Sequence, residues 1–467
     1  MQRADLVVKN GTVVTSTAMV AADLAVSDGR FSAIAAPGAL DRNVIQDAAL
    51  VYDAAGRYVL PGVIDGHVHF REPGLEYKED FSSGSRAAVM GGVTTVLDMP
   101  NTLPPTSTAE RVDDKRGLAE ATAFCDIGLF GLVAQDNLGQ LAPMARAGVV
   151  GYKCFLAETV GALGAPDDGL LLDALRTVAG LGLRMGFHAE NNAIVQHLTR
   201  QMKAAGRTDP LAHLDARPAV AEAEAIQRVA LFASSTGASI HIFHLSSSDG
   251  LAMVDAWRAR GVPVTAETSA NYCFLSSDDM RAHGSLMRIN PPVRAPGHGE
   301  ALLRGLASGR IDGIATDHSP HTLAEKQHDD IWRAVSGFAG VETSVRLFLT
   351  YAVAPGGMTL SQYVRASSEG PARAWGLYPR KGAIQVGADG DLTIVDLGKT
   401  GVIAASQLHG KNNHTPFEGR STTGEVVATV LRGQIVMRDG ELVGAPRGRL
   451  VRPVAAAPPA AGGGTTG

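Results

Sequence analysis

The chain is organised around one stretch, Pro61-Gly-Val-Ile-Asp-Gly-His-Val-His-Phe-Arg-Glu-Pro-Gly74. The apolar run from Tyr58 to Ile64 predicts a buried strand that leads into two histidines, His67 and His69. Alternate side chains of an extended strand point to the same face, so both imidazoles can reach one point. Imidazole nitrogens suit zinc and similar divalent ions, and a cation, Arg71, follows at once. The alternative interpretation is a pair of histidines in a surface turn.

The composition is that of a globular protein able to bury a large core, with 45% hydrophobic and 19% charged residues among 467. The formal net charge of −5 does not favour nucleic acid or an anionic membrane as a partner. Three cysteines, far apart and odd in number, indicate a reducing compartment and not a disulfide framework. The sequence shows no secretory signal peptide and no apolar run long enough to span a bilayer, so we expect a cytoplasmic protein.

Segments rich in β-forming residues lie toward both ends of the chain. Residues 1–55 predict short strands around the turn Asn10-Gly11, and residues 376–445 show a similar pattern around Arg432-Gly433. We expect the two flanks to pair into one small β-sheet domain, a β-sandwich; the alternative is two unrelated hairpins. Residues 454–467 are small and cannot bury enough apolar area to order themselves, which predicts a disordered tail.

Residues 56–375 alternate apolar strands with amphipathic or alanine-rich helices. Eight such units predict an α/β fold, a (β/α)8 TIM-like barrel with loop insertions. A doubly wound open sheet is the alternative. No Gly-x-Gly-x-x-Gly motif follows the first strand, which weakens a dinucleotide-binding interpretation. Active sites of such barrels lie at the carboxyl ends of the strands, so polar residues there are the candidates.

Polar side chains recur at the predicted strand ends. After the first two histidines come Lys153, His188, His244 and Asp317. Each alone has an ordinary explanation, because a strand-end histidine is usually satisfied locally, an aspartate can cap a helix and a lysine can reach solvent. Together, these groups can hold two metal ions at a hydrolytic site. Two ions need a bridging anion, which a cationic lysine can supply only as a carbamate.

At these residues the chain resembles the cyclic amidohydrolases of the amidohydrolase superfamily, namely dihydroorotases, allantoinases, hydantoinases and dihydropyrimidinases. The resemblance runs from about Val7 to Val443 and is carried by several motifs: Pro61 to Gly74, Asp98-Met-Pro-Asn-Thr102, Val264-Thr-Ala-Glu267, Asn290-Pro-Pro-Val-Arg294 and Ala315 to Thr322. It implies a (β/α)8 barrel with a sheet domain built from both termini, which agrees with the patterns above.

The resemblance also implies a role for each strand-end residue. All six would bind metal: His67, His69 and Asp317 the more buried ion, His188 and His244 the second ion, and Lys153, carboxylated by carbon dioxide, both ions. Asp317 would take a proton from the bridging water and deliver it to the leaving ring nitrogen. Zn²⁺ is the expected metal at both positions. Members of the family are commonly homo-oligomers, either dimers or tetramers.

The substrate loops follow two patterns. Arg71, Asn101 and His321 match residues that bind the substrate carboxylate in dihydroorotases, which favours hydrolysis of dihydroorotate to N-carbamoyl-aspartate or the reverse ring closure. Residues 269–273 and 331–340 depart from the dihydroorotase pattern, and the second segment is closer to hydantoinases and allantoinases. Allantoin, a hydantoin, a dihydropyrimidine or another cyclic imide is therefore the alternative substrate.

Two further expectations concern whether the protein is an enzyme and whether a lid covers its site. A non-catalytic scaffold relative is a remote alternative, because such relatives are recognised by lost metal ligands and all six positions are intact here. The expected partner is thus a small cyclic amide. The glycine-rich residues 157–169 predict a mobile lid over the site.

Overall fold

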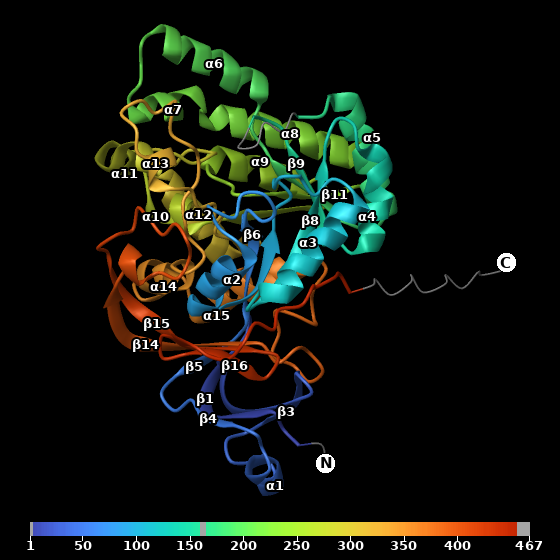
Figure 1. Ribbon diagram of the computed structural model, residues 1–467, viewed down its shortest axis with the longest axis vertical. Coiled ribbons are helices and arrows are strands. Elements are labelled where there is room, and N and C mark those ends of the chain that lie inside the picture. The colour runs from blue at the N-terminus through green and yellow to red at the C-terminus, as the bar shows by residue number, and fades with distance from the viewer. Residues whose placement is uncertain (1–2, 159–164, 455–467) are drawn as a thin grey trace, which may run out of the picture.

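The computed structural model describes residues 3–158 and 165–454, which form two β-sheets and the helices that surround the second (Figure 1). The first sheet, here called the terminal sheet, contains nine strands among the described residues. They are β1 (Leu6–Val14), β2 (Met19–Ser27), β3 (Arg30–Ala35), β4 (Val51–Asp53), β5 (Tyr58–Pro61), β14 (Leu392–Val402), β15 (Ser421–Leu431), β16 (Gln434–Arg438) and β17 (Glu441–Leu442).

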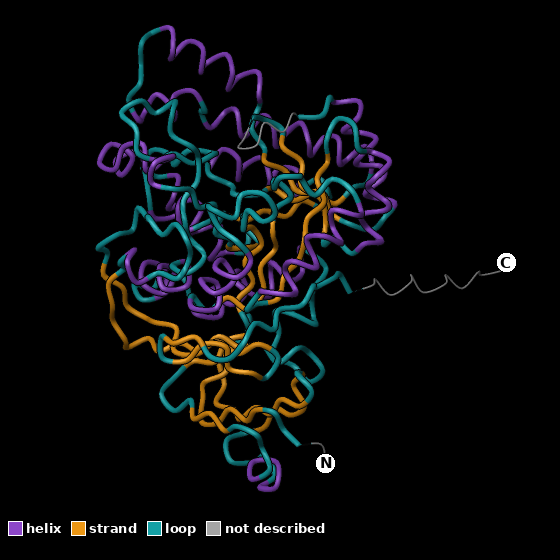
Figure 2. The backbone as a smooth tube through the Cα atoms, viewed as in Figure 1, coloured by secondary structure: helices purple, strands orange, loops and turns teal. Residues whose placement is uncertain are grey.

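The terminal sheet joins the two ends of the chain. Strand β14 pairs antiparallel with β5, with Leu392 opposite Pro61, while β5 pairs parallel with β1. Buried side chains of both flanks, such as Leu24 and Ile394, share one apolar cluster. Figure 2 shows these strands gathered at one end of the molecule. The predicted joint sheet domain is therefore confirmed, and two unrelated hairpins are excluded.

The second sheet has eight parallel strands and forms the barrel. They are β6 (Val63–Val68), β7 (Val93–Asp98), β8 (Asp126–Val133), β9 (Gly151–Phe155), β10 (Arg184–His188), β11 (Ser239–Ile242), β12 (Val264–Thr268) and β13 (Gly313–Ile314). Each strand pairs with the next in sequence, and a parallel bridge between Val68 and His318 brings the last edge back to the first. This order confirms the barrel and excludes the doubly wound sheet.

Most of the helices cover the barrel. They are α2 (Phe81–Met90), α3 (Ala109–Thr122), α4 (Leu141–Ala147), α5 (Asp168–Gly180), α6 (Asn192–Ala204), α7 (Pro210–Ala216), α8 (Ala219–Thr236), α9 (Ser248–Arg258), α10 (Ala270–Phe274), α11 (Ser277–His283), α12 (His298–Ser308), α13 (Leu323–Lys326), α14 (Ser344–Phe348), α15 (Leu360–Val364) and α16 (Gly370–Ala374). A short α1 (Arg42–Gln46) lies beside the terminal sheet.

Local sequence sets where these helices begin. Asp80 caps α2, and its side chain accepts a hydrogen bond from the Ser83 backbone N–H. Asp167 caps α5 and Asn191 caps α6 in the same manner. A side-chain oxygen in this position satisfies a backbone donor that has no partner inside the helix. These three caps fix where α2, α5 and α6 begin after β6, β9 and β10.

One predicted strand is wrong in detail. The apolar run from Tyr58 to Ile64 predicts a single strand, but the structure divides it at Gly62 between β5 in the terminal sheet and β6 in the barrel. The chain passes very close to its neighbours there, since a Cβ on Gly62 would lie 2.2 Å from Thr94 Oγ1. Apolar periodicity cannot distinguish one buried strand from two that continue in different sheets.

Two expectations fall partly or wholly outside the described residues. Residues 159–164 of the predicted lid (157–169) and residues 455–467 of the predicted tail (454–467) lie outside the described residues. In the part of the chain that the structure describes, none of the helices combines the length and the apolar character needed to cross a membrane.

Candidate metal centre and active site

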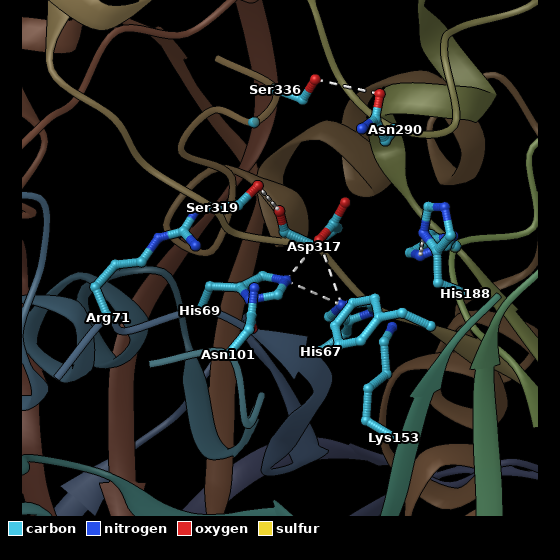
Figure 3. A pocket seen from close by; sticks show the side chains of 13 residues that line it. His67, His69, Arg71, Asn101, Lys153, His188, Asn290, Asp317, Ser319 and Ser336 are labelled. Atoms are coloured by element: carbon cyan, nitrogen blue, oxygen red, sulfur yellow. Dashed lines mark hydrogen bonds and ion pairs between the residues drawn. The ribbon is translucent and has the colours of Figure 1, made fainter. Parts of the chain in front are cut away.

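The six predicted strand-end residues line one pocket, together with Arg71 and Asn101 (Figure 3). The six come from five barrel strands or the residues just after them: His67 and His69 at β6, Lys153 on β9, His188 on β10, His244 after β11 and Asp317 after β13. Parallel strands bring their carboxyl ends to the same rim, which is why residues so distant in sequence meet.

His67, His69 and Asp317 form the first cluster. The two Nε2 atoms of the histidines lie 3.2 Å apart, and Asp317 Oδ1 lies 3.4 Å from His67 Nε2 and 3.2 Å from His69 Nε2. Burial, with the Lys153 amine nearby, holds the pKa of His67 well below its usual range, and burial also lowers the pKa of His69. Both rings are therefore neutral, as metal ligation by imidazole requires.

His188 and His244 form the second cluster. His188 Nδ1 lies 3.0 Å from His244 Nε2, and burial lowers the pKa of both rings. The ring centroids of His67 and His244 are 5.2 Å apart, so the two clusters adjoin. Nitrogen atoms this close, with lone pairs directed at the same space, repel each other unless a cation or a proton lies between them.

Lys153 lies beneath both clusters and is fully buried. Its Nζ has no hydrogen-bond partner among the described residues and lies 4.0 Å from the centroid of the Phe243 ring. Burial lowers the pKa of Lys153 to about 7. A buried amine without a partner is unfavourable as an ammonium ion and reactive as a neutral nucleophile. The side chains thus fit a two-metal group in which this lysine carries a bridging carbamate.

The backbone is strained where three of these side chains leave their strands. Arg71, His244 and Asp317 adopt positive φ values of 66°, 40° and 52°. A non-glycine residue in this region costs on the order of 1–3 kcal/mol. Among the described residues, the other non-glycine residues with positive φ each precede a glycine: Asp28, Arg432 and Asp439 lie in turns, and Asn10 lies inside β1. The predicted turn at Asn10-Gly11 is thus wrong, because β1 continues through it with a bulge. The strain at the pocket is therefore tied to the site and not to turns.

Two carboxylates behind the histidines were not predicted as site residues. His67 Nδ1–H donates to Glu267 Oε1 at 3.0 Å, and His188 Nε2–H donates to Glu190 Oε2 at 2.7 Å. Arg217 in turn donates to Glu190, with Nη2 2.8 Å from Oε2. Each carboxylate fixes which ring nitrogen faces the pocket. The signal in the sequence was a glutamate inside or directly after an apolar strand, the same signal that singled out Lys153.

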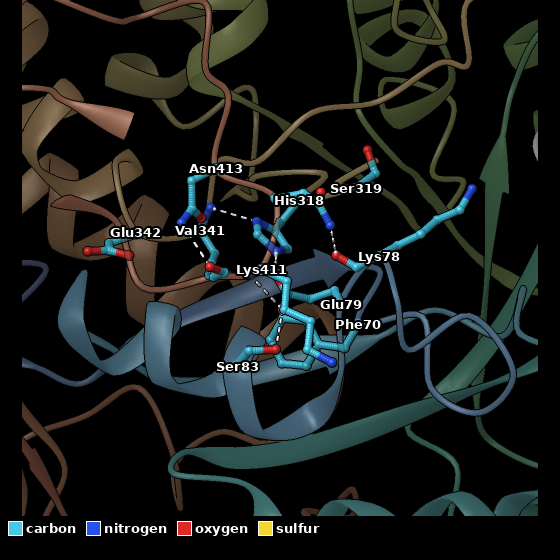
Figure 4. A network of polar contacts seen from close by, with 12 residues as sticks. Phe70, Lys78, Glu79, Ser83, His318, Ser319, Val341, Glu342, Lys411 and Asn413 are labelled. Atoms are coloured by element: carbon cyan, nitrogen blue, oxygen red, sulfur yellow. Dashed lines mark hydrogen bonds and ion pairs between the residues drawn. The ribbon is translucent and has the colours of Figure 1, made fainter. Parts of the chain in front are cut away.

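A second buried network holds the segment that carries Asp317 (Figure 4). His318 Nδ1 accepts from the backbone N–H of Gly340 at 3.1 Å, and the His318 carbonyl accepts from the His69 backbone N–H at 2.8 Å. His318 Nε2 therefore carries the ring proton and lies 3.5 Å from Glu79 Oε2. Glu79 is fully buried and also accepts from the backbone N–H of Lys411. His318 thus ties the segment that carries Asp317 to the backbone of His69 and Gly340.

The predicted carboxylate-binding residues are only partly brought together. Arg71 and Asn101 line the pocket, and Asn101 Oδ1 accepts from His69 Nδ1–H at 2.7 Å, which leaves its amide N–H groups free to donate. His321 lies behind Arg71, with Nε2 3.0 Å from Arg71 Nη2. Its Nδ1 accepts from Lys78 Nζ at 3.0 Å, and its Nε2–H donates to the Ser336 carbonyl at 3.1 Å. Both ring nitrogens are thus engaged by neighbours other than Arg71.

A parallel eight-stranded barrel with these side chains around one pocket is the arrangement of an amidohydrolase. A model of the Amidohydrolase family matches residues 58–436, and the chain belongs to that family. Within it, the chain is one of the cyclic amidohydrolases, hydrolases that act on cyclic amides.

The relatives have three different named activities. The allantoinase of Deinococcus radiodurans is 36% identical over 451 residues, which is 96% of this chain and 99% of the relative. The dihydroorotase of Halobacterium salinarum is 41% identical over 410 residues, which is 87% of this chain and 92% of the relative. The solved structure of an L-hydantoinase (dihydropyrimidinase) from Arthrobacter aurescens matches with a TM-score of 0.93 at 35% identity, covering 96% of this chain and 100% of that one.

Proposed function

We propose that this cyclic amidohydrolase acts on a ring that carries a carboxylate, with dihydroorotate as the leading substrate. The observation that carries the proposal is Arg71. Its side chain is 2% exposed, its Nε has no hydrogen-bond partner among the described residues, and burial lowers its pKa only to about 10, so it stays cationic at neutral pH. Arg71 forms no ion pair with a carboxylate of the described residues, and its charge is met only by His321 at Nη2. A buried cation without a counter-charge is strongly unfavourable, and a bidentate substrate carboxylate would satisfy it.

Asn101 supports the same assignment. Because its oxygen accepts from His69, its amide nitrogen is the atom left to face the ligand, and it can only donate. A carboxylate that spans Arg71 and Asn101 would hold the ring in one orientation above the histidine clusters. Holding the ring in this orientation would raise kcat, because a carbonyl already placed for attack loses less entropy on reaching the transition state.

The metal group is part of the proposal. His67, His69 and Asp317 would hold one Zn²⁺ ion, His188 and His244 the other, and Lys153, as a carbamate, both. When bound, such ions lower the pKa of water to near neutrality and polarise the ring carbonyl. Asp317 would accept the proton of the attacking water at its carboxylate and donate it to the leaving ring nitrogen. His318 and Glu79 would keep the Asp317 carboxylate in place during both transfers.

The decisive experiment compares dihydroorotate with dihydrouracil, which differ only in the carboxylate. We expect wild-type kcat/KM to be higher for dihydroorotate. We expect Arg71→Gln to lower kcat/KM by about 100-fold for dihydroorotate, the equivalent of one charged hydrogen-bond pair at about 3 kcal/mol, and by less than about tenfold for dihydrouracil. Equal losses on both rings, or a wild type that ignores dihydroorotate, would overturn the proposal. Metal content and the thermal midpoint serve as controls for folding.

Allantoin or a hydantoin is the second candidate. The allantoinase and L-hydantoinase relatives align with 96% and 94% of this chain, compared with 87% for the dihydroorotase. Adding allantoin and 5-methylhydantoin to the panel decides between the candidates, because neither carries a carboxylate for Arg71. We also propose a homo-oligomer, either a dimer or a tetramer, which sedimentation velocity tests directly.

A further inference from the structure

A second cavity of about 400 Å³ adjoins the active-site pocket. The two share Asn290 and Ser336, whose side chains meet where Ser336 Oγ donates to Asn290 Oδ1 at 3.2 Å (Figure 3). The far wall of the second cavity is formed by α6, at the end of the molecule opposite the terminal sheet (Figure 1). The Asn290–Ser336 pair therefore forms the boundary between the two cavities.

The second cavity carries an excess of positive charge. Arg200, Lys203 and Arg288 line it, and none of them forms an ion pair with a described carboxylate. Arg288 is instead held by backbone carbonyls, with Nη1 donating to Ile331 O at 2.7 Å, and its Nε has no partner among the described residues. One lining carboxylate, Glu158, opposes these three cations and accepts from Gln196 Nε2 at 2.9 Å.

Arg217 also lines the cavity but does not add to this excess. Its guanidinium donates from Nε and Nη2 to the buried carboxylate of Glu190, so its charge is already balanced. The unbalanced cations are thus those on α6 and on the segment just before Asn290. Two of them, Arg200 and Lys203, lie on exposed positions of α6 from which both can move toward a ligand.

One wall of the cavity is flat and apolar. The Trp332 indole donates from Nε1 to the Arg207 carbonyl at 2.8 Å, which fixes the ring, and Lys203 Nζ lies 5.4 Å from the ring centroid. Val195 adds an aliphatic surface on the α6 side. An aliphatic or planar chain can pack against these groups while its end meets the cations.

We propose that this cavity extends the substrate site and takes an acidic substituent carried by the cyclic amide. The inference rests on the proposed ring hydrolysis and refines its substrate class: the physiological ring would carry an acidic side chain that reaches past Asn290 and Ser336 to Arg200, Lys203 and Arg288. Dihydroorotate has no such side chain and would then be a minimal substrate, bound through Arg71 and Asn101 without the second cavity.

The test uses substrates that differ in charge but not in shape. One is a hydantoin whose 5-substituent is a carboxyalkyl chain of two, four or six carbons, and its partner is the matching primary amide. For the chain length that fits, we expect wild-type kcat/KM to be at least tenfold higher for the acid than for the amide at low salt. We expect that ratio to fall as ionic strength rises, because the cations on α6 are exposed.

The double variant Arg200→Gln/Lys203→Gln should lower the acid-to-amide ratio toward one, leaving only the part that Arg288 contributes. The matched control, Arg304→Gln/Lys399→Gln, removes two exposed cations far from the cavity in sequence and should keep the wild-type ratio. A ratio near one in the wild type at every chain length, or a ratio unchanged in the cavity variant, overturns the inference. Failure of the proposed function looks different, since the wild type would then ignore dihydroorotate, or Arg71→Gln would lose equally on dihydroorotate and dihydrouracil, whatever the acid-to-amide ratio in the hydantoin series.

Discussion

Two buried lysines show opposite ways of placing a cation inside this molecule. Lys381 lies where the barrel meets the terminal sheet, and its Nζ is 2.6 Å from Asp126, 2.5 Å from Asp391 and 3.1 Å from Asp389. Burial alone would lower its pKa, but the three carboxylates raise it. Lys153, in the active-site pocket, has no such partner, and burial lowers its pKa to about 7.

The difference separates a region built for stability from one built for chemistry. At the junction the charges balance, because Arg432 also donates to Asp126 and Arg380 approaches Asp389. In the pocket, Lys153 Nζ, Arg71 Nε and His244 Nδ1 have no partners among the described residues. Buried polar groups are normally hydrogen-bonded, so a cluster of unpaired buried atoms indicates a site whose partners are supplied by a ligand.

The largest effect is expected from Lys153→Met. Loss of the bridging group should lower kcat by at least about 10³-fold, because metal-assisted charge stabilisation contributes several kcal/mol to the transition state. The metal-free variant should be no less stable than the metal-free wild type, since a buried amine without a partner is replaced by an apolar side chain of similar length. Turnover assays measure the loss of kcat, and urea unfolding of the metal-free proteins measures the stability.

An active Lys153→Met variant would remove the lysine from the metal group. A marked loss of stability would instead mean that this amine has a structural partner, and the contrast with Lys381 would then disappear.

The next effect tests the other lysine. Lys381→Met should lower the free energy of unfolding by about 3–5 kcal/mol, the usual result of leaving buried charges without their partner. Urea unfolding at neutral pH measures it, and Lys381→Arg, which keeps the charge, should lose less. A change below about 1 kcal/mol would show that the three carboxylates are held by Arg432 and Arg380 alone.

The third effect concerns a residue behind the pocket. Glu190→Gln should weaken metal binding by about 10–100-fold, because the carboxylate that orients His188 and balances Arg217 is lost. Metal content after dialysis against a graded chelator series measures the change independently of turnover. Glu300→Gln, an exposed substitution in the first turn of α12, is the control. Equal metal retention in both variants would reduce Glu190 to a structural ion pair.

The sequence predicts the barrel and the six pocket residues for one physical reason. Parallel strands place their carboxyl ends together, so polar side chains that end apolar runs must meet, as His67 and Asp317 do across 250 positions. The same reasoning cannot place Glu190 or His321. The role of Glu190 depends on its facing a ring nitrogen of His188, and the role of His321 depends on which neighbours face its own two ring nitrogens. It also misses the division at Gly62, where strand continuity is decided by a close approach to Thr94.

The smallest effect is expected at His409, whose side chain is more exposed than either lysine. His409 Nδ1 donates to Glu342 Oε1 at 2.8 Å, and this hydrogen bond raises the pKa of His409. A folded pKa above the unfolded value means that the pair stabilises fully below about pH 6.5 and loses its contribution as pH rises through the folded pKa. Because the His409 side chain is 35% exposed, the contribution should stay below about 1 kcal/mol.

His409→Gln should therefore be less stable than the wild type at pH 6, with the gap closing by pH 8, as measured by urea unfolding at both values. A gap that widens toward pH 8 would mean that His409 is bound as the neutral ring. A gap of several kcal/mol at pH 6 would mean that solvent does not screen this pair. The exposed pair would then contribute as much as the buried Lys381 network, and exposure would not separate the two.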